Sequence, residues 1–149
     1  MRTRLRAKLA VAALVAILAG ASFALFAPSG PAVAFSSGGL FLDVQVESPA
    51  HLVSRGAAVD VPLEVTCSGT SRADVFVSVS QKAGSGVAQG FGSTSVGCTG
   101  SGQQVTVRVQ ASGGKTFKQG TAVANAQIFG CNRVTCGSET DSEVIQLQK

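Results

Sequence analysis

Residues 59–67 read Val-Asp-Val-Pro-Leu-Glu-Val-Thr-Cys, and this stretch decides the fold class of the chain. Apolar side chains occupy every second position, with polar residues or proline between them. Side chains of an extended chain point alternately to opposite faces, so the pattern predicts a strand with one buried and one solvated face. The strand ends on Cys67, which makes it both a wall of the core and an anchor for a cross-link. Pro62 lacks the N–H that a ladder needs, and it therefore predicts an edge position or a bulge.

Similar alternation recurs downstream, and turn residues separate the segments. No helical period follows residue 34, so we expect an all-β fold over residues 40–149. Seven or eight short strands are typical of an immunoglobulin-like antiparallel β-sandwich. Residues 48–56, which include His51, are expected to form a loop, and the glycine-rich residues 82–92 at most a short edge strand. The expected strands are 40–47, 59–67, 74–81, 95–99, 103–110, 121–129 and 143–148.

Residues 1–34 have the features of a secretory signal peptide. Four basic residues precede an almost wholly apolar run over residues 9–27, and Ala32-Val33-Ala34 is a small-residue cleavage signature. We predict a signal helix that is cleaved after Ala34, a flexible leader over residues 35–39, and a secreted protein, extracellular or associated with the cell envelope, without a stable membrane anchor. The alternative is an uncleaved anchor, because the apolar run approaches the length of a bilayer span.

Removal of the signal changes the charge of the chain. The 149-residue sequence has a formal net charge of +4, from 12 Lys and Arg against 8 Asp and Glu. Four of the basic residues lie in the signal and all of the acidic residues lie after it, so the mature part has no net charge. Binding to nucleic acid depends on clustered Lys and Arg, and we therefore exclude it. We expect a monomer.

All four cysteines follow the signal, and an even number in a small exported chain indicates two disulfides. The spacing favours Cys67–Cys98 with Cys131–Cys136. The rival pairing, Cys67–Cys131 with Cys98–Cys136, would resemble the inter-sheet bridge of immunoglobulin domains, but the chain has no Trp to pack on such a bridge. The spacings do not match a zinc ribbon and no histidine lies nearby, so we expect no metal site.

The sequence contains no catalytic constellation, and we expect neither enzymatic activity nor a cofactor. His51 is the only histidine, and no nucleophile or acid is directed to it by the pattern of the sequence. Asp60 and Glu64 lie on the outward side of a predicted strand, where solvated charges are a simpler interpretation than a glycosidase pair.

Three residues are candidates for an interaction surface. Phe76 and Phe129 alternate with the apolar residues of their strands, and as neighbouring outward side chains they would form an apolar patch or pocket. The sequence favours the simpler interpretation, in which they pack under a loop or in a second layer. Arg133 lies in the short loop between Cys131 and Cys136. Binding of sugars on aromatic platforms is not favoured, because the mature part has no Trp or Tyr.

Several motifs are similar to those of small uncharacterised secreted β-sandwich proteins of actinobacteria. They are V-x-L-x-V-T-C, S-V-x-Q, V-x-C-T-G, F-x-x-G-x-A-x-A-x-A and the late cysteine pair. The resemblance covers the whole mature chain and implies export. That family has no assigned activity, so it implies no function.

The chain also resembles the neocarzinostatin-like enediyne chromoprotein apoproteins, which are secreted sandwiches with two local disulfides. Their later disulfide closes a Cys-x4-Cys loop like that from Cys131 to Cys136, although the spacing from Cys67 to Cys98 is longer here. No ligand-contacting residue of that family is matched, so this resemblance implies the fold, and a carrier of a small apolar ligand is kept as an alternative function. Secreted subtilisin inhibitors share the size and the disulfide number, and their reactive loop beside a disulfide compares with the loop of Arg133.

These observations predict a secreted, non-enzymatic interaction or structural module with an unknown protein partner. The first alternative is a carrier of a small apolar ligand. The second is a protease inhibitor that presents the Cys131–Cys136 loop.

Overall fold

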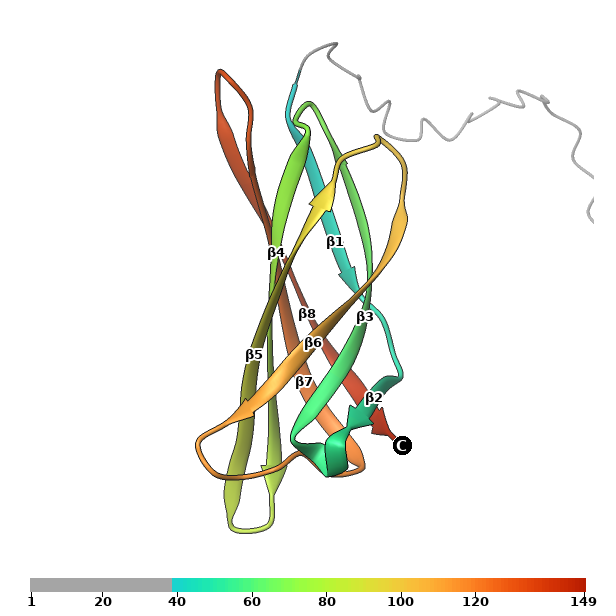
Figure 1. Ribbon diagram of the computed structural model, residues 1–149, viewed down its shortest axis with the longest axis vertical. Coiled ribbons are helices and arrows are strands. Elements are labelled where there is room, and N and C mark those ends of the chain that lie inside the picture. The colour runs from blue at the N-terminus through green and yellow to red at the C-terminus, as the bar shows by residue number, and fades with distance from the viewer. Residues whose placement is uncertain (1–38) are drawn as a thin grey trace, which may run out of the picture. The chain divides into compact units, whose positions relative to one another are not determined.

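The computed structural model describes residues 39–149, which form eight strands and one short 3-10 helix (Figure 1). The expectation of an all-β chain with seven or eight strands is confirmed. The predicted signal peptide (residues 1–34) and residues 35–38 of the predicted leader lie outside the described residues. The elements are β1 (Phe41–Val46), β2 (Ala50–Val53), η1 (Ser54–Gly56), β3 (Ala58–Ser68), β4 (Arg72–Ala83), β5 (Gly86–Gly97), β6 (Gln103–Ser112), β7 (Gly120–Cys131) and β8 (Cys136–Gln148).

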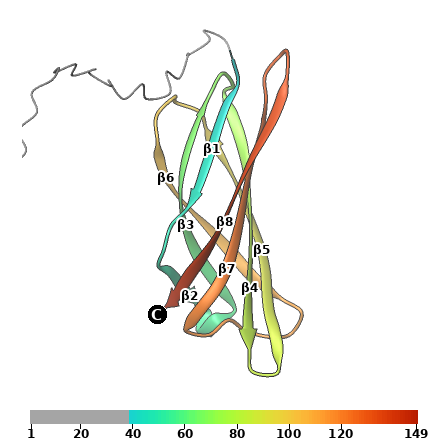
Figure 2. The same cartoon turned by 180° about the vertical axis from the view of Figure 1, so that it is seen from behind.

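Hydrogen bonds join all eight strands into one sheet, in the order β1-β3-β2-β8-β7-β4-β5-β6. β3 also pairs with β6, so the sheet closes on itself like a barrel. The pairings are antiparallel apart from the short parallel contact between β2 and β8. Figure 2 shows the same strands from behind. The two-layer sandwich stays a prediction, because the strands form one continuous hydrogen-bonded sheet.

β3 is the centre of this arrangement, because it pairs with three other strands. β1 lies along its later half and β2 along its first residues, while β6 pairs with it on the opposite side. The alternation of residues 59–67 predicted this strand correctly. Its inward side chains are all fully buried: Val59, Val61, Leu63, Val65 and Cys67.

The edge position or bulge predicted at Pro62 is wrong. β3 pairs with β6 without interruption through Pro62 and Thr106, so it is neither an edge strand nor bulged there. The carbonyl of Pro62 accepts a hydrogen bond from the Glu47 N–H at 3.0 Å on the other side of β3. In an antiparallel strand the N and the carbonyl of one residue point to the same side. The nitrogen of Pro62 therefore points to the gap between the end of β1 and the start of β2, where no strand is paired with β3. The lack of an N–H at this position thus costs no ladder hydrogen bond.

The loop predicted over residues 48–56 contains a strand. β2 occupies its middle, and His51 pairs with Asp60 of β3. The strand is only four residues long and links β3 to β8. Its shortness explains why alternation in the sequence did not reveal it, since a strand of this length offers only two positions to each face.

The segment over residues 82–99 is also more regular than predicted. A glycine-rich stretch and a short strand were expected, but β5 runs as one strand from Gly86 to Gly97 and pairs with β4 along its whole length. Gly90 and Gly92 are needed because the backbone of β6 approaches closely: a Cβ atom at either position would collide with a β6 carbonyl oxygen. These glycines permit strand packing rather than a turn.

The core consists mainly of valine and alanine, and Phe117 is its largest buried side chain. Phe117 comes from the loop between β6 and β7, and its N–H donates to the Gly56 carbonyl at 2.9 Å. Gln81 on β4 is the only buried polar residue among residues 39–149, with 5% of its surface exposed. Its amide nitrogen donates to the Lys118 carbonyl at 2.8 Å, and its amide oxygen accepts from the Lys118 N–H at 2.8 Å. These two bonds fix the loop that carries Phe117.

Candidate interaction surface

The structure pairs Cys67 with Cys98 and Cys131 with Cys136, which is the pairing that the spacing favours. The first disulfide joins the end of β3 to the residue that follows β5. The second joins the last residue of β7 to the first residue of β8 across their hairpin. Disulfides persist in oxidising compartments, so the two bridges indicate an extracellular or periplasmic protein.

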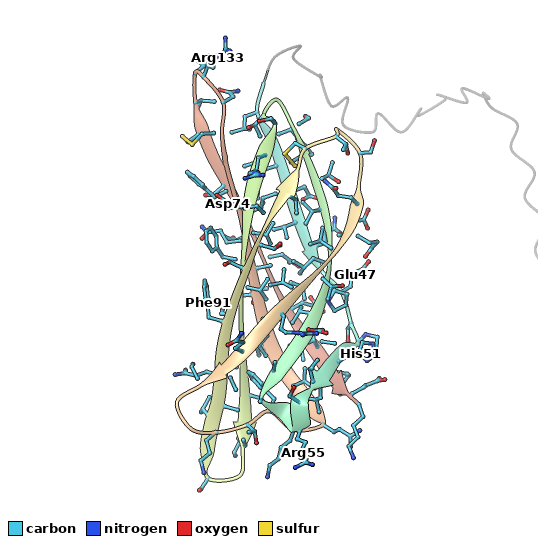
Figure 3. The ribbon with its side chains drawn as sticks, in the orientation of Figure 1. Glu47, His51, Arg55, Asp74, Phe91 and Arg133 are labelled. Atoms are coloured by element: carbon cyan, nitrogen blue, oxygen red, sulfur yellow. A yellow bond between two sulfur atoms is a disulfide. The ribbon has the colours of Figure 1, made fainter. Side chains whose placement is uncertain are left out.

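The Cys131–Cys136 loop forms the exposed tip of the β7–β8 hairpin (Figure 3). Arg133 lies at this tip, and the neighbouring Val134 is 93% exposed. The turn is closed by its own hydrogen bonds, since the side-chain oxygen of Asn132 accepts from the N–H groups of Val134 and Thr135 at 2.9 Å each. Arg133 is therefore presented on a tight turn beyond the paired ends of β7 and β8.

Phe76 and Phe129 both lie on the outward sides of their strands, but they do not form a pair with each other. Phe76 is half-buried and Phe129 is 41% exposed. The ring of Phe76 stacks with that of Phe91 on β5, with 6.3 Å between centroids and 20° between planes. Phe91 is 57% exposed and is labelled at the side of the sheet in Figure 3. The sequence did not reveal this partner, because it predicted at most a short edge strand over residues 82–92 and not the continuous strand β5.

We call the outer side of the neighbouring strands β5, β4, β7 and β8 the neutral face. β5 and β7 contain no charged residue. The outward charges of β4 (Arg72, Asp74 and Lys82) lie toward the ends of that strand. The middle of the face is built from Phe76, Ser78, Ser80, Gln89, Phe91, Ser93, Val123, Asn125, Gln127, Thr140, Ser142 and Val144.

The acidic residues of β8 do not belong to this face. Glu139, Asp141 and Glu143 alternate with its outward residues, because they pair with the inward-facing positions of β7. The Asp141 carboxylate accepts a hydrogen bond from the Val46 N–H of β1 at 2.8 Å. It satisfies a backbone group of β1 that has no strand partner on that side.

We call the outer side of β1, β3 and β6 the charged face. Asp43, Asp60, Glu64 and Arg108 lie on it, each on the side of its strand opposite to the buried residues. Arg108 donates from Nε and Nη2 to the two carboxylate oxygens of Asp60, at 2.7 and 2.8 Å. This contact lowers the pKa of Asp60, and a smaller effect of burial opposes it. It also raises the pKa of Arg108.

A shallow trough of about 500 Å³ lies in the middle of the neutral face. The Phe76–Phe91 pair forms one side of it, and the amide and hydroxyl side chains of β7 and β8 form the other. Its lining residues are Phe76, Ser78, Phe91, Asn125, Ala126, Gln127, Thr140, Asp141 and Ser142, of which Ala126 and Asp141 are a pair at inward strand positions. The trough therefore combines an aromatic surface with groups that both donate and accept hydrogen bonds.

A second depression lies beside η1 and the loop that carries Phe117. Leu52 and Phe117 contribute apolar surface, and Arg55, Lys118 and Lys149 contribute positive charge. Ser54 and Arg55 adopt positive φ angles of 51° and 59°, which are uncommon for residues other than glycine. The tight turn there is held by the hydrogen bond between Gly56 and Phe117.

Within residues 39–149, no cluster of His, Cys, Asp and Glu has the arrangement of a metal site. His51 lies on β2 with an exposed side chain (Figure 3). In the same part of the chain, no helix is long and apolar enough to cross a membrane.

No protein-family model and no curated protein matches the chain. A solved structure with some similarity is AggA, the major subunit of aggregative adherence fimbriae type I from Escherichia coli. The identity is 14% and the TM-score 0.39, over 73% of this chain and 94% of that chain. A likeness at this level carries no information on function.

Proposed function

We propose that the chain is a secreted, non-enzymatic interaction or structural module, built as an immunoglobulin-like β-sandwich, and that it binds its partner through the neutral face. The observation that supports this proposal is the absence of charged side chains from the middle of an exposed four-stranded surface. Asp43, Glu64 and Arg108 show that the same chain places charges on other outward strand positions.

The physical reason is the cost of desolvation. An ionised side chain that is covered by a partner loses its hydration and must be paired. Hydroxyl and amide groups lose less, and each can both donate and accept a hydrogen bond to the partner. Phe91, Phe129 and Val144 add exposed apolar surface, each more than 40% accessible. A surface of this composition is suited to being covered.

The carrier and inhibitor alternatives have less support. For the carrier, the space between the strands is filled by buried side chains, and Phe117 closes it at one end. For the inhibitor, Arg133 lies on a turn that is closed by the side chain of Asn132.

The test introduces a charge at the centre of the neutral face. Asn125→Lys should lower the fraction of labelled protein retained on washed cells of the producing organism by about tenfold, because the partner would have to cover an unpaired ammonium group. Thr106→Lys is the matched control, since it adds the same charge to an outward position of β6 on the charged face. Both variants should keep the unfolding temperature of the unmodified protein.

Two outcomes would refute the proposal. Equal loss in the two variants would mean that net charge, not the neutral face, governs retention. Full retention of Asn125→Lys would mean that the partner binds elsewhere.

A further inference from the structure

The neutral face has a composition that distinguishes between classes of partner. Interface cores between proteins are depleted in serine as well as in charged residues. Here serine is frequent: Ser78, Ser80, Ser93 and Ser142 lie in the middle of the face. The side chains suit a partner that presents many neutral hydroxyl groups rather than a second apolar protein surface.

The trough offers such a partner a place to stack. The two rings of Phe76 and Phe91 lie nearly parallel, and 57% of Phe91 is exposed. A sugar ring has one face of C–H groups, which packs on an aromatic ring by the same burial of apolar surface that aromatic side chains use elsewhere. The absence of Trp and Tyr does not prevent this contact, because stacking needs the face of the ring and not a polar handle.

The opposite side of the trough offers hydrogen bonds at short range from the rings. Asn125 and Gln127 on β7 and Thr140 on β8 are exposed beside Phe76, which pairs across the sheet with Gln127. Amide and hydroxyl groups match sugar hydroxyls, which are also both donors and acceptors. Asp141 borders the trough, but its carboxylate is engaged by the Val46 N–H.

The exposed apolar side chains extend beyond the trough along β7, in a strip in which Asn125 and Gln127 lie between Val123 and Phe129. On β7 Phe129 lies near one end of the strip and Val123 near the other, and both are about 40% exposed. At about 3.3 Å per residue, the strip between them is about 20 Å long. A surface of this length accommodates several consecutive sugar rings. It is therefore suited to a polymer rather than to a monosaccharide.

We infer that the neutral face binds an uncharged polysaccharide, with sugar rings stacked on Phe76 and Phe91 and hydroxyl groups bonded to Asn125, Gln127 and Thr140. This inference rests on the proposed function and adds the class of partner. Anionic polymers are disfavoured, because no cation lies in the middle of the face. The outward cations of β4, Arg72 and Lys82, lie near the two ends of that strand.

The experiment measures depletion of the intact, secreted protein by polysaccharide beads. Cellulose, chitin, cross-linked dextran and galactomannan are the neutral probes, and polygalacturonate and heparin are the anionic ones. We expect saturable binding to at least one neutral probe, unchanged in high salt, since charge screening does not affect contacts between neutral groups. Phe91→Ala should weaken the apparent Kd about tenfold, because an aromatic anchor is lost.

Phe41→Ala is the matched control, since Phe41 is 46% exposed and lies on the outward side of β1 on the charged face. The inference is overturned if the two variants bind alike, if only the anionic probes bind, or if no probe binds. It is also overturned if sedimentation shows a dimer that Asn125→Lys dissociates, since the face would then bind a second copy.

The cell-retention test separates this inference from the proposed function. Loss of retention by Asn125→Lys without binding to any bead would refute the polysaccharide and leave the neutral face as the interaction surface. Failure of both tests would refute both.

Discussion

The neutral face and the charged face are built on the same inward pattern but differ in what they show to solvent. In β3 and β6 of the charged face and in β4 and β7 of the neutral face, mainly apolar side chains alternate inward and fill one shared core. Outward, the charged face carries Asp43, Asp60, Glu64 and Arg108, as is usual for a solvated antiparallel sheet. The neutral face carries hydroxyls, amides and phenylalanine.

The difference teaches that folding does not dictate the outward residues of the neutral face. The alternation needs only polar or small side chains between the buried ones, and Asp60 or Glu64 meets this requirement as well as Ser78 does. Surface charge normally favours solubility, so a chain that omits it from the middle of four outward strand faces loses that benefit there. This composition supports the proposed contact with a partner.

The largest expected effect concerns the covalent link between the two faces. Cys67–Cys98 joins β3 of the charged face to the residue after β5 of the neutral face, with a sequence separation of 31. Replacing both cysteines by serine should lower the free energy of unfolding by about 3–4 kcal/mol in the chain-entropy model. Urea denaturation followed by circular dichroism measures this change.

The control is the bridge within the neutral face. Cys131–Cys136 has a sequence separation of only 5, so its removal should cost less, about 2 kcal/mol. Equal losses would show that the link between the faces has no special weight.

A smaller effect is expected from Gln81, which is the inward polar residue of the neutral-face strand β4. Gln81→Ala leaves the N–H and the carbonyl of Lys118 without their partners, at a cost of about 1–3 kcal/mol. Gln89→Ala is the control, because Gln89 is an exposed glutamine on the neighbouring strand β5 and its loss should change the free energy by less than about 0.5 kcal/mol. Similar unfolding midpoints for the two variants would contradict the assigned role of Gln81.

The sequence predicted strands well where apolar and polar residues alternate strictly along the segment. Residues 59–67 and 103–110 have valine or leucine at the inward positions, and the structure has β3 and β6 there. β5 was missed because its inward positions include Gly90 and Gly92, which carry no apolar side chain and look like turn residues. Their reason for being glycine is the close approach of the β6 backbone, a contact that the local sequence pattern does not display.

The candidate site depended on register, which the sequence does not display. Phe76 and Phe129 both lie on the outward sides of their strands, where the alternation places them. The stacking partner of Phe76 is Phe91, because the β4–β5 register places Phe91 opposite Ser78, diagonal to Phe76. A shift of one residue would have turned Phe91 to the core. Long-range pairing thus decided which phenylalanines meet.

The smallest effect belongs to the charged face, where Asp60 and Arg108 form an exposed ion pair. Because the pKa of Asp60 is lowered in the folded state, the pair stabilises the protein above the pKa of the unfolded carboxyl, about 3.9, and this contribution is lost as the pH falls through the folded pKa. Asp60→Asn should therefore lower the unfolding temperature slightly at neutral pH and not at all in strong acid. Such surface pairs contribute little, and added salt should reduce the difference further.

Two further variants sharpen the contrast between the faces. Arg108→Gln removes the same contact from the other side, so it should reproduce the pH dependence of Asp60→Asn, and the double variant should be no worse than either single one. Gln127→Ala on the neutral face changes no charge, so its effect on the unfolding temperature should not vary with pH. If Gln127→Ala followed the pH as Asp60→Asn does, charge would govern both faces alike, and the distinction between them would fail.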